Sequence, residues 1–404
     1  MKIAIIGQGY VGLPLSLNFA QKGINVLGFD IDEIRTKSLN LGISHIEDVA
    51  DKDLKAAISK GTYTASSDES DISDCEAVII AVPTPLNDAR LPDLSYVISA
   101  SEMIGKSLSK SALIINESTS YPGTLRNEIA VTLAKNSKPG LKHLYSVSPE
   151  RVDPGNKNWN ISNTPRLIAG ITPEATIKTK ELYSKICENI IEVSSPEVAE
   201  SAKLFENTFR QVNIALVNEF ALIMNAMGIP ANEAIDAAAT KPYGFMKFSP
   251  GLGVGGHCIP VDPSYLAYVA TIAGIQPRFI ELANKVNLQM PAAIMGIIKS
   301  QNGGSLKGKS ILVCGVSYKP NVADTRETPA KLLIEELKAA GAEVSWHDPV
   351  VENWNGQKSV TLGQKKYDST IITLHHDIFD YEAISKSTEY LFDCLGQIPE
   401  AHTL

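Results

Sequence analysis

The chain begins with Met1-Lys2-Ile3-Ala4-Ile5-Ile6-Gly7-Gln8-Gly9-Tyr10-Val11-Gly12, an apolar run followed at once by three spaced glycines. An amphipathic stretch continues to Lys22, so the segment predicts a strand, a tight loop and a helix. In that arrangement Gly7 permits the turn, Gly9 lets a pyrophosphate come close, and Gly12 lets the helix pack on the strand. The pattern predicts a dinucleotide-binding α/β domain.

The second predicted strand supports this interpretation. Gly23 ends the helix, and the strand predicted over residues 24–29 is followed by Asp30. An acidic side chain at this point binds a ribose 2′-hydroxyl and repels a 2′-phosphate. We therefore expect NAD rather than NADP, although Arg35 nearby would soften the repulsion.

Length and composition are those of a soluble enzyme with more than one domain. The 404 residues are 44% hydrophobic and 20% charged, and no apolar run reaches the roughly 18 to 20 residues that span a bilayer. The net charge of −8 and the lack of a basic cluster argue against nucleic acid as a partner. The start of the chain resembles a signal peptide, but Gln8 and Asn18 interrupt the apolar run.

The cysteines are scattered, and none has the spacing of a disulfide framework or a zinc site. We expect reduced thiols, a cytoplasmic protein and no metal. The five residues are Cys75, Cys187, Cys258, Cys314 and Cys394.

Cys258 differs from the others because it follows a glycine loop, Gly251-Leu252-Gly253-Val254-Gly255-Gly256-His257. Glycines let a ligand approach the main chain closely, which suggests that the thiol is accessible. Asp262, four residues later, could move protons or organise water beside the sulfur. A glycine turn with an inert buried cysteine is the alternative, and this segment alone does not separate the two.

Strands alternate with helices up to about residue 195. Apolar runs predict buried parallel strands over 77–83, 112–117, 144–148, 166–169 and 190–193. Ligands of doubly wound sheets bind beyond the carboxyl ends of the strands. Polar loops follow three of these strands, namely Val82-Pro83-Thr84-Pro85, Glu117-Ser118-Thr119 and Ser148-Pro149-Glu150-Arg151. Each fits ordinary turn chemistry, but together they indicate a site at one edge of the sheet.

A long helix is predicted next. Ser195-Pro196-Glu197 supplies a cap, a first-turn proline and an acidic residue, and neither Gly nor Pro interrupts residues 198–227. A helix of about 30 residues is about 45 Å long, so we expect it to join two domains and to bury one face against a second subunit. Lys203 and Asn207 share a face near its start. A solvated lysine is the ordinary alternative.

The last third of the chain repeats the opening theme. Strands over 310–315 and 343–348, with a helix over 328–340 between them, predict a second α/β nucleotide-binding domain. Its first loop lacks the glycine fingerprint, which suggests a different ligand with a single nucleotide. Lys319 and Arg326 are candidate contacts for phosphate or sugar oxygens.

Taken together, the chain resembles the nucleotide-sugar 6-dehydrogenase family, which includes UDP-glucose, UDP-N-acetylhexosamine and GDP-mannose dehydrogenases, over essentially its whole length. The matching motifs are Gly7-x-Gly9-Tyr10-Val11-Gly12, Val82-Pro83-Thr84-Pro85, Glu117-Ser118-Thr119, Ser148-Pro149-Glu150-Arg151, Lys203-x-x-x-Asn207, Gly255-Gly256-His257-Cys258-x-x-x-Asp262, and Tyr318-Lys319-Pro320 with Asp324-x-Arg326. The resemblance implies two Rossmann-like doubly wound α/β domains joined by a long central helix. It implies an NAD-binding domain at 1–195, a central helical dimerisation domain at 196–300 and a nucleotide-sugar-binding domain at 301–404.

The resemblance also implies a four-electron oxidation of the sugar C6 alcohol to a carboxylate, with two NAD⁺. Cys258 would capture the aldehyde as a thiohemiacetal, and a second oxidation would give a thioester that water cleaves. Lys203 and Asn207 would stabilise the oxyanion at C6. Asp262, with Thr119 and water, would serve proton transfer.

Glu150 would activate or position the hydrolytic water in this scheme. The residues implied to bind the cofactor are Gly7, Gly9, Tyr10, Val11, Gly12, Asp30, Arg35, Thr84, Thr119 and Arg326. The residues implied to bind the substrate are Glu150, Arg151, Lys203, Asn207, Gly255 and Lys319. Many relatives carry an arginine after an aspartate near the C-terminus, where this chain reads Asp393-Cys394, so no substrate-binding arginine is carried over there.

Three stretches most resemble the UDP-N-acetylglucosamine branch, at 44–46, 150–156 and 240–246. A pocket built for a 2-acetamido group should turn over UDP-glucose poorly. UDP-glucose, UDP-N-acetylmannosamine and UDP-N-acetylgalactosamine stay as alternative substrates. A single-step β-hydroxyacid-type dehydrogenase would not need Cys258, and a non-catalytic NAD-binding scaffold would produce no NADH with any nucleotide sugar.

Overall fold

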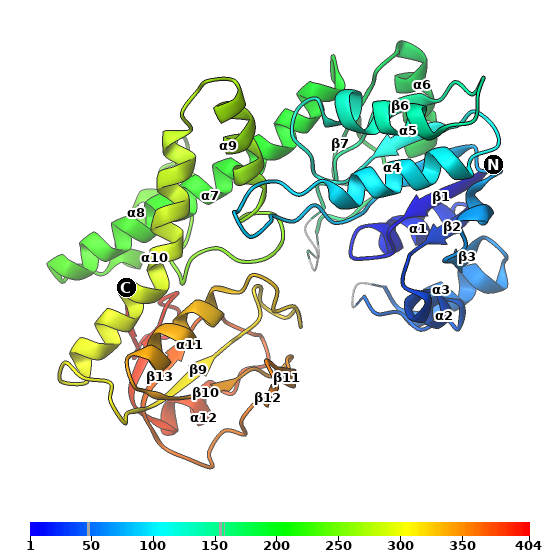
Figure 1. Cartoon of the computed structure of the whole chain (residues 1–404). Coiled ribbons are helices and arrows are strands. Elements are labelled where there is room, and N and C mark those ends of the chain that lie inside the picture. Colours follow the sequence, from blue (N-terminus) through cyan, green and yellow to red (C-terminus); the bar gives the residue numbers. More distant parts are fainter. Residues whose placement is uncertain (47–48, 153–155, 157) are drawn as a thin grey trace. The chain divides into compact units, whose positions relative to one another are not determined.

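The computed structural model describes residues 1–46, 49–152, 156 and 158–404. These residues form two compact units, of which the first holds 1–206 and 264–273 and the second holds 207–263 and 274–404. The boundary falls inside one long helix, α7 (Pro196–Met227). Each unit has its own sheet with helices packed against it (Figure 1).

The sheet of the first unit has the strand order β3-β2-β1-β4-β5-β6-β7-β8. The order from β3 to β6 is that of dinucleotide-binding Rossmann domains, and these strands are parallel. The strands are β1 (Lys2–Ile6), β2 (Asn25–Phe29), β3 (Tyr63–Ser66), β4 (Ala77–Ile80), β5 (Leu113–Asn116), β6 (Leu144–Val147), β7 (Arg166–Gly170) and β8 (Ile190–Glu192).

The last two strands of this sheet differ from the sequence prediction of buried parallel strands. β7 pairs antiparallel with β6, with Val147 opposite Ala169. β8 lies at the edge of the sheet, so it has one neighbour and Ile191 is 47% exposed. An apolar run does not encode strand direction or edge position, and the prediction was wrong on both points. The reversal at β7 brings its first residue, Arg166, to the carboxyl edge of β6.

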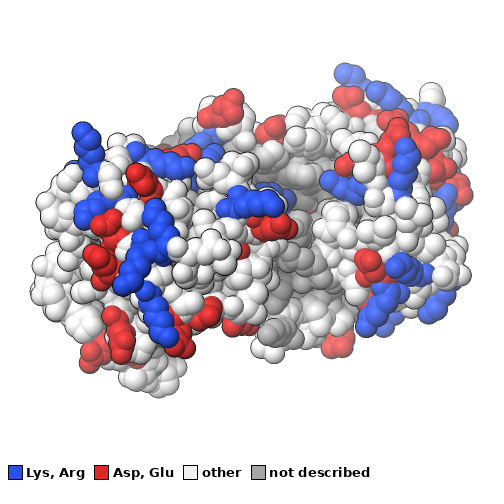
Figure 2. Space-filling model, turned by 90° about the horizontal axis from the view of Figure 1, so that it is seen from below, with Lys and Arg blue, Asp and Glu red and all other residues white. Residues whose placement is uncertain are grey.

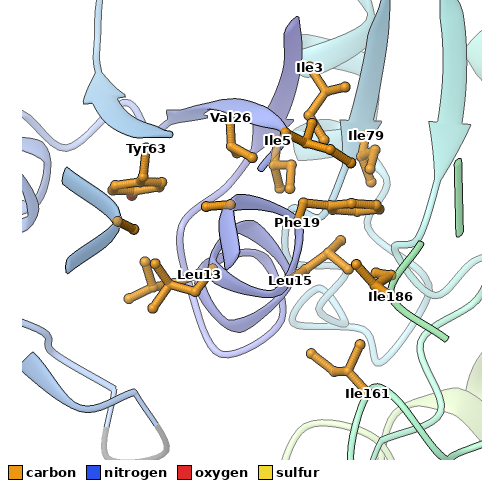
Figure 3. Close-up of a cluster of buried hydrophobic side chains, with 14 of the residues drawn as sticks. Ile3, Ile5, Leu13, Leu15, Phe19, Val26, Tyr63, Ile79, Ile161 and Ile186 are labelled. Atoms are coloured by element: carbon orange, nitrogen blue, oxygen red, sulfur yellow. The ribbon is translucent and has the colours of Figure 1, made fainter. Parts of the chain in front are cut away.

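Helix α1 fixes the glycine loop on the sheet of the first unit. Its apolar residues Leu15 and Phe19 are fully buried, with Phe19 beside Ile5 and Ile79 of the sheet and Leu15 toward Ile186 (Figure 3). Burial of each such side chain contributes roughly 1.5–3 kcal/mol, so the start of α1 is held firmly beside the end of β1. The helices of this unit are α1 (Gly12–Gln21), α2 (Glu33–Asn40), α3 (Asp51–Ser59), η1 (Glu69–Ile72), α4 (Ser95–Ser107), η2 (Leu125–Ile129), α5 (Ala130–Asn136), α6 (Pro173–Tyr183) and most of α9 (Asp262–Ile272).

The second unit contains a parallel sheet of order β10-β9-β13-β14-β15. Its strand order reverses between β9 and β13, as in doubly wound nucleotide-binding folds, so the predicted second α/β domain is confirmed. The elements are α8 (Ala231–Ala239), α10 (Arg278–Gln301), β9 (Ser310–Cys314), α11 (Pro329–Ala339), β10 (Glu343–His347), β11 (Asn353–Trp354), β12 (Gln357–Lys358), β13 (Tyr367–Ile372), α12 (Tyr381–Lys386), β14 (Thr388–Asp393) and β15 (His402–Thr403).

The predicted long helix is present as α7, and its predicted cap is confirmed, because the Val198 N–H donates to Ser195 Oγ at 3.4 Å. Across the described residues, no helix combines the length and apolarity that crossing a membrane requires. On the face shown in Figure 2, lysine and arginine side chains are interspersed with acidic ones rather than gathered in one patch.

Candidate active site

The glycine loop after β1 has the shape that a pyrophosphate needs. A Cβ on Gly12 would lie 1.8 Å from the carbonyl oxygen of Gly7, so only glycine lets α1 start this close to the loop. A Cβ on Gly9 would meet no atom within 4 Å. The open side of Gly9 at a helix N-terminus leaves room for an anion held by backbone N–H groups, and the predicted residues Tyr10 and Val11 lie in the same loop.

Asp30 lies directly after β2 and beside this loop. The carboxylate is buried and accepts a hydrogen bond from the Gln8 N–H at 2.9 Å, so it is placed where a ribose would follow the pyrophosphate. Arg35 lies against it, with 2.8 Å between Nη1 and Asp30 Oδ2. The loop and Asp30 therefore fit NAD, of which the loop would hold the pyrophosphate and Asp30 the ribose.

A buried cluster of charges lies at the carboxyl ends of β5 and β6. Arg166 places Nη1 2.8 Å from Glu117 Oε1 and Nη2 3.1 Å from Glu150 Oε2. Burial raises the pKa of Glu117 to about 7. Burial opposes ionisation of Glu150, but the charge of Arg166, the backbone donors and the charge of Lys203 together outweigh it, so the pKa of Glu150 is lowered. Glu150 is thereby held as a carboxylate.

Other predicted residues belong to the same unit as Glu150. Arg151 forms an ion pair with Glu206 of α7, with 2.6 Å between Nη2 and Oε1. Lys203, also on α7, is only 9% exposed, and its charge acts on Glu150. Thr119 is half-buried in the loop after β5, and Thr84 is half-buried in the loop after β4. The predicted loops thus belong to one edge of one sheet.

The thiol loop is joined to two other predicted residues in the second unit. Asn207 of α7 donates from Nδ2 to Asp262 Oδ2 at 2.5 Å, and both side chains are buried. The Asp262 N–H donates to the Cys258 carbonyl at 2.8 Å, where a turn leads into α9. Cys258 is exposed whereas the other four cysteines are buried, which confirms that its thiol is accessible.

The glycines before Cys258 serve packing as well as access. Gly256 has φ +84°, and a Cβ there would lie 2.7 Å from the ring of Tyr318. A Cβ on Gly253 would lie 2.6 Å from the Asn287 carbonyl oxygen on α10. The loop therefore needs glycine because neighbouring protein atoms approach it, a reason that the sequence alone did not show.

Sequence reasoning missed the contact between His257 and Asp324. His257 Nε2 lies 3.2 Å from Asp324 Oδ2, and Arg326 donates to the same carboxylate from Nε at 2.9 Å. Burial opposes ionisation of Asp324, but the hydrogen bonds from His257 and Arg326 outweigh it, so the pKa of Asp324 is lowered. The predicted residue Arg326 is thus tied to the residue before the thiol, while Lys319 lies partly buried earlier in the same loop.

A second missed residue is Glu200, one helical turn before Lys203 on α7. Its buried carboxylate accepts the Gly123 N–H at 2.7 Å, the Leu125 N–H at 3.0 Å and the Ser120 hydroxyl at 3.3 Å. These donors all belong to the segment that follows Thr119. Glu200 therefore ties the loop that carries Thr119 to the helix that carries Lys203.

We expect Glu200→Ala to lower the free energy of unfolding by about 2 to 4 kcal/mol, because two buried backbone N–H groups lose their acceptor. The matched control is Glu197→Gln, one turn earlier, where a more exposed pair with Arg126 at 2.8 Å is lost and less than about 1 kcal/mol should follow. Urea denaturation followed by tryptophan fluorescence and circular dichroism measures both. Equal effects of the two variants would show that Glu200 has no special structural role.

Three family models match consecutive parts of the chain. They describe the NAD-binding, central and UDP-binding domains of the UDP-glucose/GDP-mannose dehydrogenase family and match residues 1–187, 197–289 and 312–399. The chain belongs to this family. It is thus an NAD-dependent nucleotide-sugar dehydrogenase, and the predictions of the family, of NAD and of the fold are confirmed.

Individual relatives extend over the whole chain. It is 36% identical over 413 residues to a UDP-N-acetyl-D-glucosamine 6-dehydrogenase of Pseudomonas aeruginosa, covering 97% of this chain and 96% of that protein. It is 34% identical over 403 residues to a UDP-N-acetyl-D-mannosamine dehydrogenase of Pyrococcus horikoshii, covering 96% and 94%. The solved structure of a UDP-D-ManNAc dehydrogenase from Pyrococcus horikoshii aligns with a TM-score of 0.90 and 33% identity, covering 100% and 97%.

Proposed function

We propose that the chain oxidises the C6 alcohol of a UDP-sugar to a carboxylate in two steps that share a covalent intermediate on Cys258. The exposed thiol carries this proposal, because it is the accessible cysteine and its loop is bonded to Asp262, which in turn holds Asn207. A dehydrogenase that stopped at the aldehyde would not need a nucleophile in that position.

Bound NAD⁺ supplies the oxidising chemistry, since it accepts the hydride that leaves C6 in each step. The Cys258 sulfur adds to the aldehyde carbon, which forms a C–S bond and converts the carbonyl oxygen to an oxyanion. Lys203 and Asn207 stabilise this oxyanion, and their i, i+4 spacing on α7 presents both side chains on one face. Loss of the second hydride leaves a thioester at C6.

Proton transfers are assigned to carboxylates and a hydroxyl. Asp262, with Thr119 and water, takes the proton of the C6 hydroxyl, and Glu150 receives a proton from the water that hydrolyses the thioester. The support for Glu150 is its ionised state, and the support for Asp262 is its hydrogen bond to Asn207. The remaining predicted residues are proposed to bind, with Thr84, Arg35 and Arg326 toward NAD⁺ and Arg151, Gly255 and Lys319 toward the UDP-sugar.

UDP-N-acetylglucosamine is the proposed sugar nucleotide. The Pseudomonas aeruginosa relative carries that substrate in its name, and the segment 240–246 exposes large side chains that could enclose a sugar, with Tyr243 72% and Met246 63% exposed. Of the other stretches, 44–46 lies in the first unit, and residues 153–155 fall outside the described residues. The free cysteines fit the cytoplasmic location proposed from the sequence.

Steady-state kinetics with UDP-N-acetylglucosamine, UDP-N-acetylmannosamine, UDP-N-acetylgalactosamine and UDP-glucose test the sugar. We expect kcat/KM for UDP-glucose to be about 10-fold or more below that for UDP-N-acetylglucosamine, because a pocket with partners for the acetamido group leaves them unpaired when the group is missing. NADH absorbance gives the rates. A preference for UDP-glucose would overturn the N-acetyl assignment, and a preference for another N-acetyl sugar would move it to that epimer.

We also propose a homodimer that forms through α7. Large apolar side chains recur along this helix at intervals of four or seven residues, which places them on one face. They are exposed by 41% to 66%, and they are Phe205, Phe209, Leu216, Ile223 and Met227. Such a stripe, about 33 Å long, is typical of a helix that packs against a partner. The central segment 196–300 would then be the dimerisation domain predicted from the sequence.

Leu216→Glu should weaken this dimer by at least about 10-fold in Kd, since it places a charge in an apolar interface. Ile177→Glu is the matched control, because Ile177 is an exposed isoleucine on α6 and away from the stripe. Sedimentation velocity across a concentration series measures the mass of each. A wild-type chain that sediments as a monomer, or a Leu216→Glu variant as dimeric as the control, would contradict the proposal.

A further inference from the structure

We propose that Arg166 is a positioning residue for the hydrolytic step, because it orients Glu150 as a carboxylate while Glu117 and Tyr183 hold Arg166 in place. The proposal rests on the function above, in which Glu150 takes a proton from water. It adds three residues to the account of that step, and none of them contacts the substrate in it.

The reversal of β7 explains how Arg166 reaches Glu150. Val147 of β6 lies opposite Ala169 of β7 in the antiparallel register, so continuing that register brings Arg166 opposite Glu150. A parallel β7 would have put its first residue at the other edge of the sheet. The Arg166 side chain is only 4% exposed, so its contacts with the two carboxylates are shielded from bulk water.

Three donors fix the orientation of the Glu150 carboxylate. Oε1 accepts the N–H groups of Arg151 and Val152, each at 2.6 Å, and Oε2 accepts from Arg166 Nη2 at 3.1 Å. A carboxylate offers about four lone-pair positions, so within the described part of the chain one position on Oε2 is left for a water. Arg166 therefore decides which way that last position points.

Arg166 is itself held from three sides. Its Nη1 donates to Glu117 Oε1 at 2.8 Å and to Ser148 Oγ at 3.1 Å, and the Tyr183 ring lies 4.8 Å from the guanidinium carbon. The Tyr183 hydroxyl donates to the same Glu117 oxygen. These contacts come from β5, β6 and α6, so the guanidinium plane is set before any ligand binds.

The arrangement is costly for a purely structural ion pair. Two carboxylates share one guanidinium, and within the described residues Glu117 Oε2 is buried without a hydrogen-bond partner. Buried ion pairs often give no more stability than apolar side chains of the same volume. A structural ion pair with Arg166 would need only one carboxylate, Glu117. The need to keep Glu150 ionised and oriented explains why Arg166 contacts Glu150 as well.

The charges around Glu150 give the proposal a pH signature. The facing groups are Arg151 on its own loop, Glu117 after β5, Arg166 on β7 and Lys203 on α7. Burial favours the neutral form of Glu150, and the charge of Arg166 makes the largest contribution that favours the ionised form. Removing the charge of Arg166 should therefore raise the pKa of Glu150 and move the acid limb of the hydrolysis rate to higher pH.

The affected step involves no oxidation. Water adds through its oxygen to the thioester carbon, its proton passes to Glu150, the C–S bond breaks and the electron pair returns to the Cys258 sulfur as a thiolate. Both hydride transfers precede this step. An enzyme that lacks only the positioning of Glu150 should therefore complete the two oxidations and stop as the thioester.

The test uses the double variant Arg166→Gln with Glu117→Gln, which keeps polar side chains at both positions and does not leave Glu117 as a buried carboxylate without its arginine. Glu150 keeps its backbone donors and the charge of Lys203. After rapid mixing with NAD⁺ and a UDP-sugar, we expect a burst of two NADH per chain followed by turnover about 100-fold slower than wild type. Intact-protein mass spectrometry of quenched samples should show the sugar nucleotide bound to Cys258. The hydrolysis rate should have its acid limb at higher pH.

Arg126→Gln is the matched control, since it removes a partly exposed arginine–glutamate pair from the same unit and should accumulate no adduct. Arg166→Lys keeps the positive charge but cannot contact Glu117 and Glu150 with two separate nitrogen atoms, so a hydrolysis rate between those of wild type and the double variant is expected. This variant decides the question if the double variant does not fold. Wild-type hydrolysis without adduct in a folded variant, or a slowed burst instead of slowed hydrolysis, would overturn the role of Arg166. A wild-type chain that makes no NADH with any UDP-sugar would overturn the proposed function itself.

Discussion

Cys258→Ala is expected to abolish release of the sugar acid, with kcat lower by about 1,000-fold or more, while NAD⁺ and UDP-sugar still bind. In the proposed mechanism the exposed thiol forms a bond to the substrate carbon, so the loss should appear in turnover rather than in affinity. Rates are followed by NADH absorbance and by chromatography of the acid, and binding is followed by calorimetry.

The control for this variant is Cys187→Ala, which removes a cysteine that is 5% exposed and belongs to the first unit. It should change kcat by less than about threefold, because the buried Cys187 thiol contacts the carbonyl oxygens of Thr164 and Asn189 and has no part in the proposed chemistry. Near wild-type acid production by Cys258→Ala would rule out the covalent route and leave the family assignment in place.

Lys203→Ala is expected to lower kcat by about 100- to 1,000-fold with a small change in KM, the loss typical of removing one oxyanion-stabilising donor. Lys203 is buried on α7, and in the proposed mechanism its ammonium acts on the charge that develops at C6 rather than on the resting substrate. An increase in KM with kcat unchanged would instead mean that Lys203 only binds the substrate. Initial rates over a range of UDP-sugar concentrations separate these results.

Lys178→Ala controls for the loss of a lysine. Lys178 pairs with Glu174 at 2.9 Å on the surface of α6, and both side chains are more than half exposed. Surface pairs of this kind contribute little, so activity and stability should be unchanged. A comparable loss of activity in both variants would point to general destabilisation rather than to a role for Lys203 at the oxyanion.

Features with local signals could be predicted from the sequence. The strand, glycine loop and helix at residues 1–22 form one contiguous pattern, so the first domain and its cofactor were predicted correctly. The spacing of Lys203 and Asn207 needed only the helical period. The glycines before Cys258 indicated an accessible thiol, although the structure adds that Tyr318 and α10 pack against two of them.

Features that depend on distant pairing could not be predicted. Arg166 reaches Glu150 only because β7 runs antiparallel to β6, and the short apolar run after Arg166 has the same pattern in either direction. Glu200 finds its donors 75 to 80 residues earlier in the chain. His257 meets Asp324 67 residues later. A single polar residue in a helix or loop carries no local pattern that identifies a hydrogen-bond partner far away in the sequence.

The ratio of NADH formed to UDP-sugar consumed tests the central claim most directly. The covalent four-electron route predicts two NADH for each UDP-sugar, with the C6 carboxylate as the product and no free aldehyde at any time. Endpoint absorbance, with mass spectrometry of the nucleotide product, gives both quantities in one reaction. A ratio of one, with aldehyde released into solution, would contradict the account.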